Sequence, residues 1–349
     1  MKIQQVELAQ KINKLKSVVP KKPSMPILKG ILVQDGYLTA NNVELTVKAK
    51  VGVAEGESFI IPEKAFDLIN NLPDGELDIS ALEKDMIMIK ARNIKNKYQT
   101  MPAENFPTIE VQQEESKFTI KADKLLDSMK RVSYAVPIQG SNQLMSSMCL
   151  SAAEGRLNFV GLDGHLLAWD KVWYDGKFEL LIPKNTVDKL NSLGLSGEVQ
   201  IRHNKTGALF ITDEFEVFTR LVEGKYFQYQ RMFQEYPLHT TVLREELLDA
   251  ITRAKMCAED RCPVRFELKG NLLNLSIRDN TTEYHEEVEL LEEMTEEMTI
   301  GFNAKLVIET LKAFKCDEVR ISFSGSKMPA MIEEADSDFK AIVLPVKIE

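Results

Sequence analysis

Two stretches near opposite ends of the chain carry charge of a single sign. Residues 90–98 contain four basic side chains and no acidic one, and residues 283–297 contain eight glutamates and no Lys or Arg. One interpretation is that each block protects an unrelated exposed strand edge. The other is that the blocks attract each other in a head-to-tail contact between subunits, and such contacts close into rings when the rotation allows it.

The residue types that perform catalysis or bind metals occur here without the spacing that those tasks need. The chain has no glycine-rich phosphate loop and no GxSxG nucleophile motif. Cys257 and Cys262 have no second cysteine pair to complete a zinc site. His203, His239 and His285 are scattered along the chain. We therefore predict no catalytic residue, no cofactor and no metal site.

The composition limits the class of protein. Apolar residues make up 44% of the 349 residues and charged residues 28%, which argues against a disordered chain. No apolar run approaches the ~20 residues of a membrane helix, and the N-terminus has no signal-peptide core. Four cysteines in so long a chain favour a reducing, cytoplasmic setting. The net charge of −9 argues against a general nucleic-acid coat, so the positions of the basic residues matter more than their number.

The elements that must position these residues repeat three times along the chain. Each repeat begins with a short strand and a helix whose apolar residues recur at i, i+4, i+7 and i+11, one face of a 3.6-residue helix. The three stripes are Leu8, Ile12, Leu15 and Val19; Leu125, Met129, Val132 and Val136; and Leu247, Ile251, Ala254 and Ala258. The copies start 117 and then 122 residues apart, so the chain is three versions of one unit.

Each unit is predicted to place two helices on a mainly antiparallel sheet, an α+β architecture. We place three domains at residues 1–111, 117–234 and 237–349, with a polar, acidic linker after the first. The six predicted helices span residues 6–19, 62–72, 122–136, 183–193, 243–258 and 303–315.

These predicted helices are basic although the whole chain is acidic. Together they carry fifteen Lys and Arg against ten Asp and Glu, so the rest of the chain holds the acidic excess. Such charge is ordinary on solvated helix faces, but equivalent helices in equivalent units must point the same way. A shared basic lining without an aromatic ladder favours sequence-independent contact with nucleic-acid phosphates.

Six short motifs, each weak alone, follow one another in a fixed order. They are MPIL at 25–28, MPAENFP at 101–107, LDGHLLA at 162–168, LVEGKY at 221–226, IGFN at 300–303 and LPVK at 344–347. Together with the threefold repeat, they resemble the bacterial DNA sliding clamp, the DNA polymerase III beta subunit. The resemblance covers essentially the whole chain.

The resemblance implies three clamp domains in each chain and a head-to-tail homodimer, a ring that encloses duplex DNA. It implies no catalysis, because the ring is a processivity factor that tethers the DNA polymerase III alpha subunit and other proteins to the template. A separate, ATP-driven clamp loader opens and closes it. Two alternatives stay open: a clamp paralogue that binds partners outside chromosomal replication, and an enzyme on a repeated α+β scaffold.

On this resemblance we expect three sets of functional residues. DNA contacts are expected from Lys11, Lys14, Lys21, Lys22, Lys130, Arg131, Lys184, Arg253 and Arg261. A groove for partner peptides is expected from Met145, Leu162, Gly164, His165, Leu167, Arg231, Met232, Val343, Leu344, Pro345 and Val346. The subunit contact is expected from Lys95, Lys97, Tyr98, Met256, Cys257, Glu283 and Glu286.

Two positions beside the expected groove depart from the family pattern. Leu166 stands where the family usually has Arg, and Phe227 stands where it usually has Pro. We therefore expect the peptide preference to differ from that of a typical clamp.

Overall fold

The structure is a computed structural model that describes residues 1–52, 58–107, 116–140, 142–259 and 262–348. The chain divides into two compact units, Met1–Leu125 with Asp188–Leu221, and Leu126–Val187 with Val222–Glu349. Both units pack helices against antiparallel sheets, which confirms the predicted α+β class. The limits of the three predicted domains remain a prediction.

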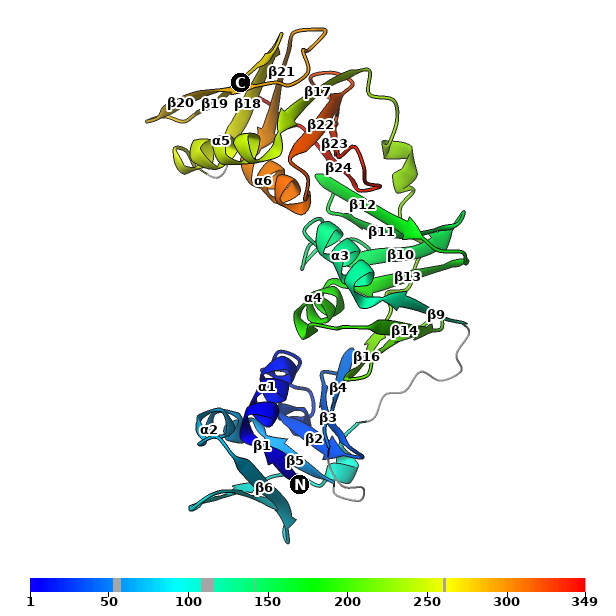
Figure 1. The fold of residues 1–349 in the computed structure, drawn as a ribbon, viewed down its shortest axis with the longest axis vertical. Helices are drawn as coiled ribbons and strands as arrows, with labels where there is room; N and C mark the ends of the chain where they lie inside the picture. The colour runs from blue at the N-terminus through cyan, green and yellow to red at the C-terminus, as the bar shows by residue number, and fades with distance from the viewer. Residues whose placement is uncertain (53–57, 108–115, 141, 260–261, 349) are drawn as a thin grey trace. The chain divides into compact units, whose positions relative to one another are not determined.

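The first unit contains a four-stranded and an eight-stranded sheet. The smaller sheet has the order β1 (Lys2–Gln4), β6 (Glu76–Leu82), β7 (Met86–Ala91) and β8 (Ile94–Gln99). The larger has the order β5 (Phe59–Pro62), β2 (Gly30–Gln34), β3 (Tyr37–Asn41), β4 (Leu45–Lys50), β16 (Phe215–Arg220), β15 (Gly207–Ile211), β14 (Glu198–His203) and β9 (Ser116–Lys121). Helices α1 (Gln5–Lys16) and α2 (Phe66–Asn71) pack against each other beside these strands (Figure 1).

The second unit repeats this plan with the sheet sizes in the opposite order along the chain. Its larger sheet has the order β13 (Phe178–Pro183), β10 (Ser147–Ala153), β11 (Arg156–Leu162), β12 (Leu166–Trp173), β24 (Lys340–Val343), β23 (Ala330–Glu333), β22 (Glu318–Phe323) and β17 (Leu238–Leu243). Its smaller sheet has the order β20 (Glu283–Glu289), β19 (Leu272–Arg278), β18 (Pro263–Lys269) and β21 (Met298–Asn303). Helices α5 (Arg244–Met256) and α6 (Ala304–Ala313) pack against each other (Figure 1).

Two further helices and four short 3₁₀ helices are present among the residues that the structure describes. Helices α3 (Ala122–Ser133) and α4 (Lys184–Leu193) each begin in one unit and end in the other. The 3₁₀ helices are η1 (Pro26–Lys29), η2 (Glu63–Ala65), η3 (Ala103–Asn105) and η4 (Tyr229–Met232). All six predicted helices are therefore present, and the second of them begins as the 3₁₀ turn η2.

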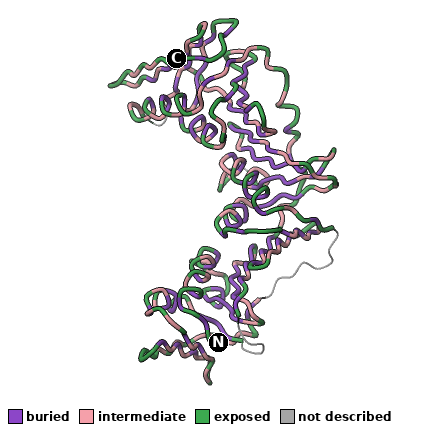
Figure 2. Tube along the Cα trace, viewed as in Figure 1, coloured by how far each residue is buried: buried purple, intermediate pink, exposed green. Residues whose placement is uncertain are grey.

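The apolar stripes explain why these helices form. Their first three positions are buried in every copy, because that face packs on a sheet (Figure 2). The fourth position lies beyond the end of the helix in every copy, because α1 ends at Lys16, α3 at Ser133 and α5 at Met256. Val136 is nevertheless only 2% exposed, whereas Val19 and Ala258 are partly exposed.

The strands of successive repeats join edge to edge in the two larger sheets. In the first unit β4 pairs with β16, and in the second unit β12 pairs with β24, both antiparallel. Strands β8 and β20 stand at the ends of their sheets, and in the described part of the chain each has one neighbouring strand. Half of the charged side chains of each block thus lie on these two edge strands, Lys95 and Lys97 on β8 and four glutamates on β20.

Candidate functional site

The residues expected to form the peptide groove gather at the joint between β12 and β24. Leu167 pairs with Ile342 across this joint, and Trp169 pairs with Lys340. Because side chains alternate along a strand, these four share one face of the sheet. The buried core of that face, which includes two tyrosines from the segment after β16, consists of Cys149, Val160, Leu162, Leu167, Leu181, Tyr226, Tyr229, Met331 and Ile342.

The other face of β12 is turned toward helix α3. Asp170 is 7% exposed there, and burial raises the pKa of its carboxyl, while a hydrogen bond with Ser128 of α3 opposes the shift. The expected groove residue Leu167 and its partner Ile342 therefore lie on the face of this sheet that is turned away from α3.

The segment that follows β16 covers the groove face with aromatic side chains. The backbone N–H of Val222 donates to the carbonyl of Leu181 at 2.9 Å, and that of Tyr226 donates to Glu179 Oε1 at 3.3 Å. These bonds hold the segment on the sheet, with its partly buried side chains against the cluster: Val222, Phe227, Phe233 and Tyr236.

The structure brings together part of the expected groove. Met145, Leu162, Leu167 and Leu344 all belong to the cluster or pack against it. The exposed turn residues Gly164 and His165 stay beside it, because the N–H of Leu344 donates to the carbonyl of His165 at 2.9 Å. Arg231 and Met232 are exposed on η4, and Pro345 is partly exposed.

One expected groove residue lies on the other face of the sheet. Val343 is 1% exposed and pairs with Leu166, so it points to the face toward α3. Position in the sequence alone did not indicate which side of this strand faces the expected groove. Val346 pairs with Gly301 of β21 and its N–H donates at 2.8 Å, so its backbone ties the last residues to the smaller sheet.

Sequence reasoning missed the aromatic part of the groove. Trp169 follows Leu167 at the two-residue strand period, and residues 226–236 hold five aromatic side chains. Both signals were present in the sequence. The sequence did not indicate that the segment after β16 folds back over the sheet.

The expected DNA contacts differ in how freely their charges are available. Lys21, Lys22 and Lys130 are exposed, whereas Lys11, Lys14 and Lys184 are partly buried. The ammonium of Lys11 donates to the carbonyl of Lys50, and the ammonium of Lys14 lies 5.0 Å from the centroid of the Phe215 ring. Arg261 lies outside the described residues.

Arg131 is tied into the second unit by its own ion pair. Its Nη1 is 2.6 Å from Glu334 Oε1 and 3.0 Å from Ser337 Oγ, and its side chain is 16% exposed. Burial works against the charge of Glu334, but bonds from Ser337, Cys316 and Arg131 outweigh it and hold the pKa of that carboxyl below its usual range. Arg131, which was expected to contact DNA, is therefore already paired within the second unit, and removing either partner would leave an uncompensated charge there.

Arg253 and Glu286 were assigned to different surfaces, yet the structure pairs them. Arg253 Nη2 is 2.5 Å from Glu286 Oε1, and Nε donates to Oε2 at 3.2 Å. These hydrogen bonds lower the pKa of the Glu286 carboxyl and raise the pKa of the Arg253 guanidinium. The pair links α5 to the edge strand β20.

Lys189 is a buried basic residue that sequence reasoning did not select. Its residue exposure is 6%, and its ammonium donates to the carbonyl of Lys14 and, at 2.8 Å, to Ser17 Oγ at the end of α1. Burial, with the charge of Lys14 as a second cause, lowers the pKa of Lys189 to about 8.

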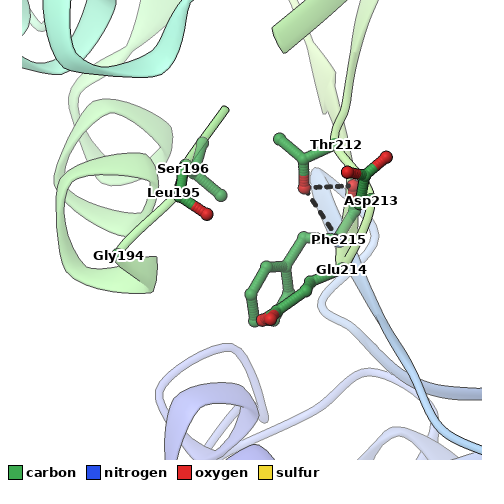
Figure 3. A pocket seen from close by; sticks show the side chains of 7 residues that line it. All are labelled: Gly194, Leu195, Ser196, Thr212, Asp213, Glu214 and Phe215. Carbon is green, nitrogen blue, oxygen red and sulfur yellow. Dashed lines mark hydrogen bonds between the residues drawn. The ribbon is translucent and has the colours of Figure 1, made fainter. Parts of the chain in front are cut away.

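A shallow pocket lined by Gly194, Leu195, Ser196, Thr212, Asp213, Glu214 and Phe215 lies between the end of α4 and the β15–β16 turn (Figure 3).

We expect Lys189 to make the first unit more stable as the pH rises from about 8 to the unperturbed value of 10.5. In that range the unfolded chain binds the proton and the folded chain does not, so stability rises with pH. Lys189→Met should therefore gain about 1 kcal/mol over the parent at pH 7, after a discount for solvent screening, and lose this advantage near pH 10.5.

Urea unfolding at pH 7, 9 and 10.5 measures this difference, with Lys21→Met, at an exposed lysine, as the matched control. A stability difference between parent and Lys189→Met that stays constant across those three pH values would contradict the expectation.

The described residues contain no group of three or more His, Cys, Asp or Glu side chains that could hold a metal ion. Among the described helices, none is both long enough and apolar enough to cross a membrane.

Strands β8 and β20 present the expected subunit contact as two edges. Lys95 and Lys97 are exposed on β8, and Tyr98 on the same strand is partly buried. On β20, Glu283 is exposed and Glu286 is partly buried. Met256, at the end of α5, is 80% exposed, and Cys257 beside it is partly exposed. An edge strand offers unpaired backbone groups to another chain.

Comparisons with known proteins agree with this architecture. Models of the N-terminal and C-terminal domains of the DNA polymerase III beta subunit match residues 1–110 and 233–347. The beta sliding clamp of Pseudomonas aeruginosa is 26% identical over 363 residues, and that of Escherichia coli K12 is 25% identical over 364 residues. Each alignment covers 99% of both chains.

Solved structures give the same result. The DNA polymerase III subunit beta from Pseudomonas aeruginosa superposes with a TM-score of 0.92 at 26% identity, covering 100% of both chains. The same protein bound to griselimycin gives a TM-score of 0.93 at 26% identity, covering 100% of this chain and 99% of that one. The chain belongs to the DNA polymerase III beta subunit family, the bacterial sliding clamps, and is not an enzyme.

Proposed function

We propose that two copies of this chain pair head to tail as a ring that encloses duplex DNA and tethers the replicative polymerase. The order of strands supports this proposal. By position in the repeat, β8 corresponds to β16 and β24, and β20 corresponds to β4 and β12. Two of the three equivalent joints are made within the chain, and the third pair of edges carries the opposed charge blocks. The proposed ring depends mainly on this third pair of strand edges.

The internal joints also suggest the register of the third. The residue that follows the one closing the hairpin turn is Thr46 in β4 and Leu167 in β12. Thr46 pairs with Phe218 of β16, and Leu167 pairs with Ile342 of β24. The corresponding turn before β20 closes with the N–H of Asp279 donating to the carbonyl of Thr282 at 2.9 Å, so Glu283 holds that place.

The partner of Glu283 follows from the β16 hairpin. Phe218 is the third residue after Phe215, which begins β16, and the third residue after Ile94, which begins β8, is Lys97. Lys97 would therefore face Glu283 of the second copy. Opposite charges at directly opposed positions stabilise a strand pair, so the proposed register is electrostatically favourable.

Contact with DNA is proposed for the exposed basic side chains near the helices, Lys21, Lys22 and Lys130, with Lys11, Lys14 and Lys184 adding charge. Arg131 is left out because Glu334 already neutralises it. Contacts to phosphates carry no sequence information, which suits a ring that must slide. Retention would come from the closed ring rather than from tight binding.

The groove on β12 and β24 is proposed to take short peptides from the DNA polymerase III alpha subunit, the clamp loader and other proteins. Apolar walls and flexible methionines such as Met145 suit a surface that binds several partners. We place this activity in the cytoplasm, with no cofactor and no membrane partner.

A DNA-retention assay tests the proposed function. The protein is loaded by a clamp loader onto a closed circular plasmid, which is then cut once with a restriction enzyme. A ring stays on the circle in high salt and leaves the linear product, because only ends release a topological link. Equal loss from circular and linear DNA would contradict enclosure, and a native mass of one chain would contradict the dimer.

The second candidate, a clamp paralogue outside chromosomal replication, is favoured by one observation. Phe227, which stands where the family usually has Pro, packs against the groove cluster, whereas Leu166 pairs with Val343 on the face toward α3 and so lies outside the groove. Primer extension with a replicative polymerase separates the two candidates. Longer products with the clamp support replication, and unchanged product length with a DNA-enclosing ring supports the paralogue.

A further inference from the structure

Three side chains join helix α5 to the edge strand β20, which lies beside it (Figure 1). Arg253 of α5 binds both carboxylate oxygens of Glu286, since Nη2 donates to Oε1 at 2.5 Å and Nε donates to Oε2 at 3.2 Å. The Tyr284 hydroxyl donates to the same Oε2 at 2.5 Å. The Glu286 carboxylate therefore accepts three hydrogen bonds from its own chain. A two-pronged bond from an arginine fixes the position of a carboxylate as well as balancing its charge.

The strand register shows which side of β20 this group occupies. Glu286 pairs with Leu275 of β19, which in turn pairs with Phe266 of β18. Both apolar side chains are buried, and directly opposed residues of an antiparallel sheet share one face. Glu286 is thus a charged side chain on the apolar face of its sheet, and it is 24% exposed because β20 is the edge.

The proposed subunit contact would cover this edge with an apolar residue. Lys97 faces Glu283 in the register inferred above, and both internal joints are antiparallel, so Ile94 of the second copy faces Glu286. Ile94 is 37% exposed and pairs with the buried Ala91 of β7, which places it on the apolar face of its own sheet. Pairing of the two copies would therefore remove water from the Glu286 carboxylate and put a hydrocarbon side chain in its place.

We propose that Arg253 is a positioning residue of the subunit contact, which keeps Glu286 neutralised and in place when β8 of the second copy covers it. This inference rests on the proposed head-to-tail pairing. A carboxylate that loses its water without a partner is strongly unfavourable, whereas one that already has a partner and hydrogen bonds is tolerated. On this assignment Glu286 makes no ion pair with the second copy, unlike Glu283.

The same ion pair matters much less in the separate chain. There the Arg253 side chain is 51% exposed, and exposed ion pairs contribute little to folding. Loss of Arg253 should therefore weaken association while leaving the fold of one chain unchanged. This combination distinguishes a positioning role from a general structural one.

Sedimentation equilibrium of four proteins tests the proposal: the parent, Arg253→Gln, Glu286→Gln and the double variant. Arg253→Gln should weaken dimerisation about 30-fold, because the second copy then covers an unpaired carboxylate. The double variant should recover most of this loss, since two neutral amides leave no buried charge.

Arg265→Gln is the matched control. Arg265 Nη2 lies 2.6 Å from Glu267 Oε1 in a similarly exposed pair, but its strand β18 is separated from the edge strand β20 by β19. Its loss should leave the dimer constant unchanged, and urea unfolding of the dissociated chain should give one midpoint for the parent and Arg253→Gln.

Two results would overturn the inference while leaving the ring intact. One is an equal dimer constant for the parent and Arg253→Gln. The other is a loss that Glu286→Gln does not recover, because Arg253 would then act on something other than this carboxylate. A parent protein that stays monomeric at every concentration would instead refute the proposed head-to-tail pairing, and this inference with it.

Discussion

Reversing Lys95 and Lys97 to Glu together should weaken self-association of the clamp about 100-fold at low salt. Both side chains are exposed on the edge strand β8, and the register inferred from the internal joints places Lys97 opposite Glu283. The register places Lys95 opposite His285, so the double change turns attraction into repulsion at the Lys97–Glu283 pair, and Lys95→Glu adds negative charge beside the glutamates of β20. The loss of an attraction of about 1 kcal/mol and the gain of a repulsion of similar size, with the smaller effect of Lys95, amount to about 2–3 kcal/mol.

Sedimentation equilibrium at low and high ionic strength measures this effect. Salt should narrow the gap between variant and parent, because exposed charges are screened within about 10 Å at 0.1 M. An unchanged dissociation constant at low salt would show that the charge blocks do not meet.

A charge exchange tests the register separately from the contact. Lys97→Glu combined with Glu283→Lys should recover most of the lost affinity, because the pair is restored with its signs exchanged. Lys97→Glu combined with Glu289→Lys is the matched control, since Glu289 is exposed on the same strand six residues further on. Equal recovery in both double variants would contradict the inferred register.

The helices of this fold could be predicted from sequence because their signal is local. A stripe such as Leu8, Ile12 and Leu15 is written within one element, and all three are fully buried. The joints β4–β16 and β12–β24 could not be predicted, because they pair strands more than 150 residues apart. Nothing within a strand specifies which distant edge will complete it.

The candidate site shows the same division between local and distant information. Motif position located Leu167 and Leu344, which do share one cluster. It also selected Arg131, whose charge is neutralised by Glu334, a residue 203 positions away. It missed Trp169 because a tryptophan in a strand indicates a core position until the covering segment is known. A charged residue on a predicted helix therefore indicates a binding surface only after the residues that form ion pairs with it have been located.

Leu344→Asp should reduce the affinity for a clamp-binding peptide at least ~100-fold while leaving dimerisation unchanged. The side chain of Leu344 packs against the groove cluster, and a peptide that covers it would bury an unpaired carboxylate there. A point substitution is preferable to truncation of residues 344–346, because the N–H of Val346 donates to Gly301 and holds the smaller sheet. The substitution also keeps the backbone bond from Leu344 to His165.

Met328→Asp provides the matched control, since Met328 is 50% exposed and lies outside both the groove cluster and the two charge blocks. Calorimetry with the peptide and sedimentation of both variants separate groove damage from general misfolding. Binding within threefold of the parent would mean that partners use another surface. A loss of dimer in Leu344→Asp alone would instead couple the groove to the edge strands, which the separate sheets of β24 and β20 give no reason to expect.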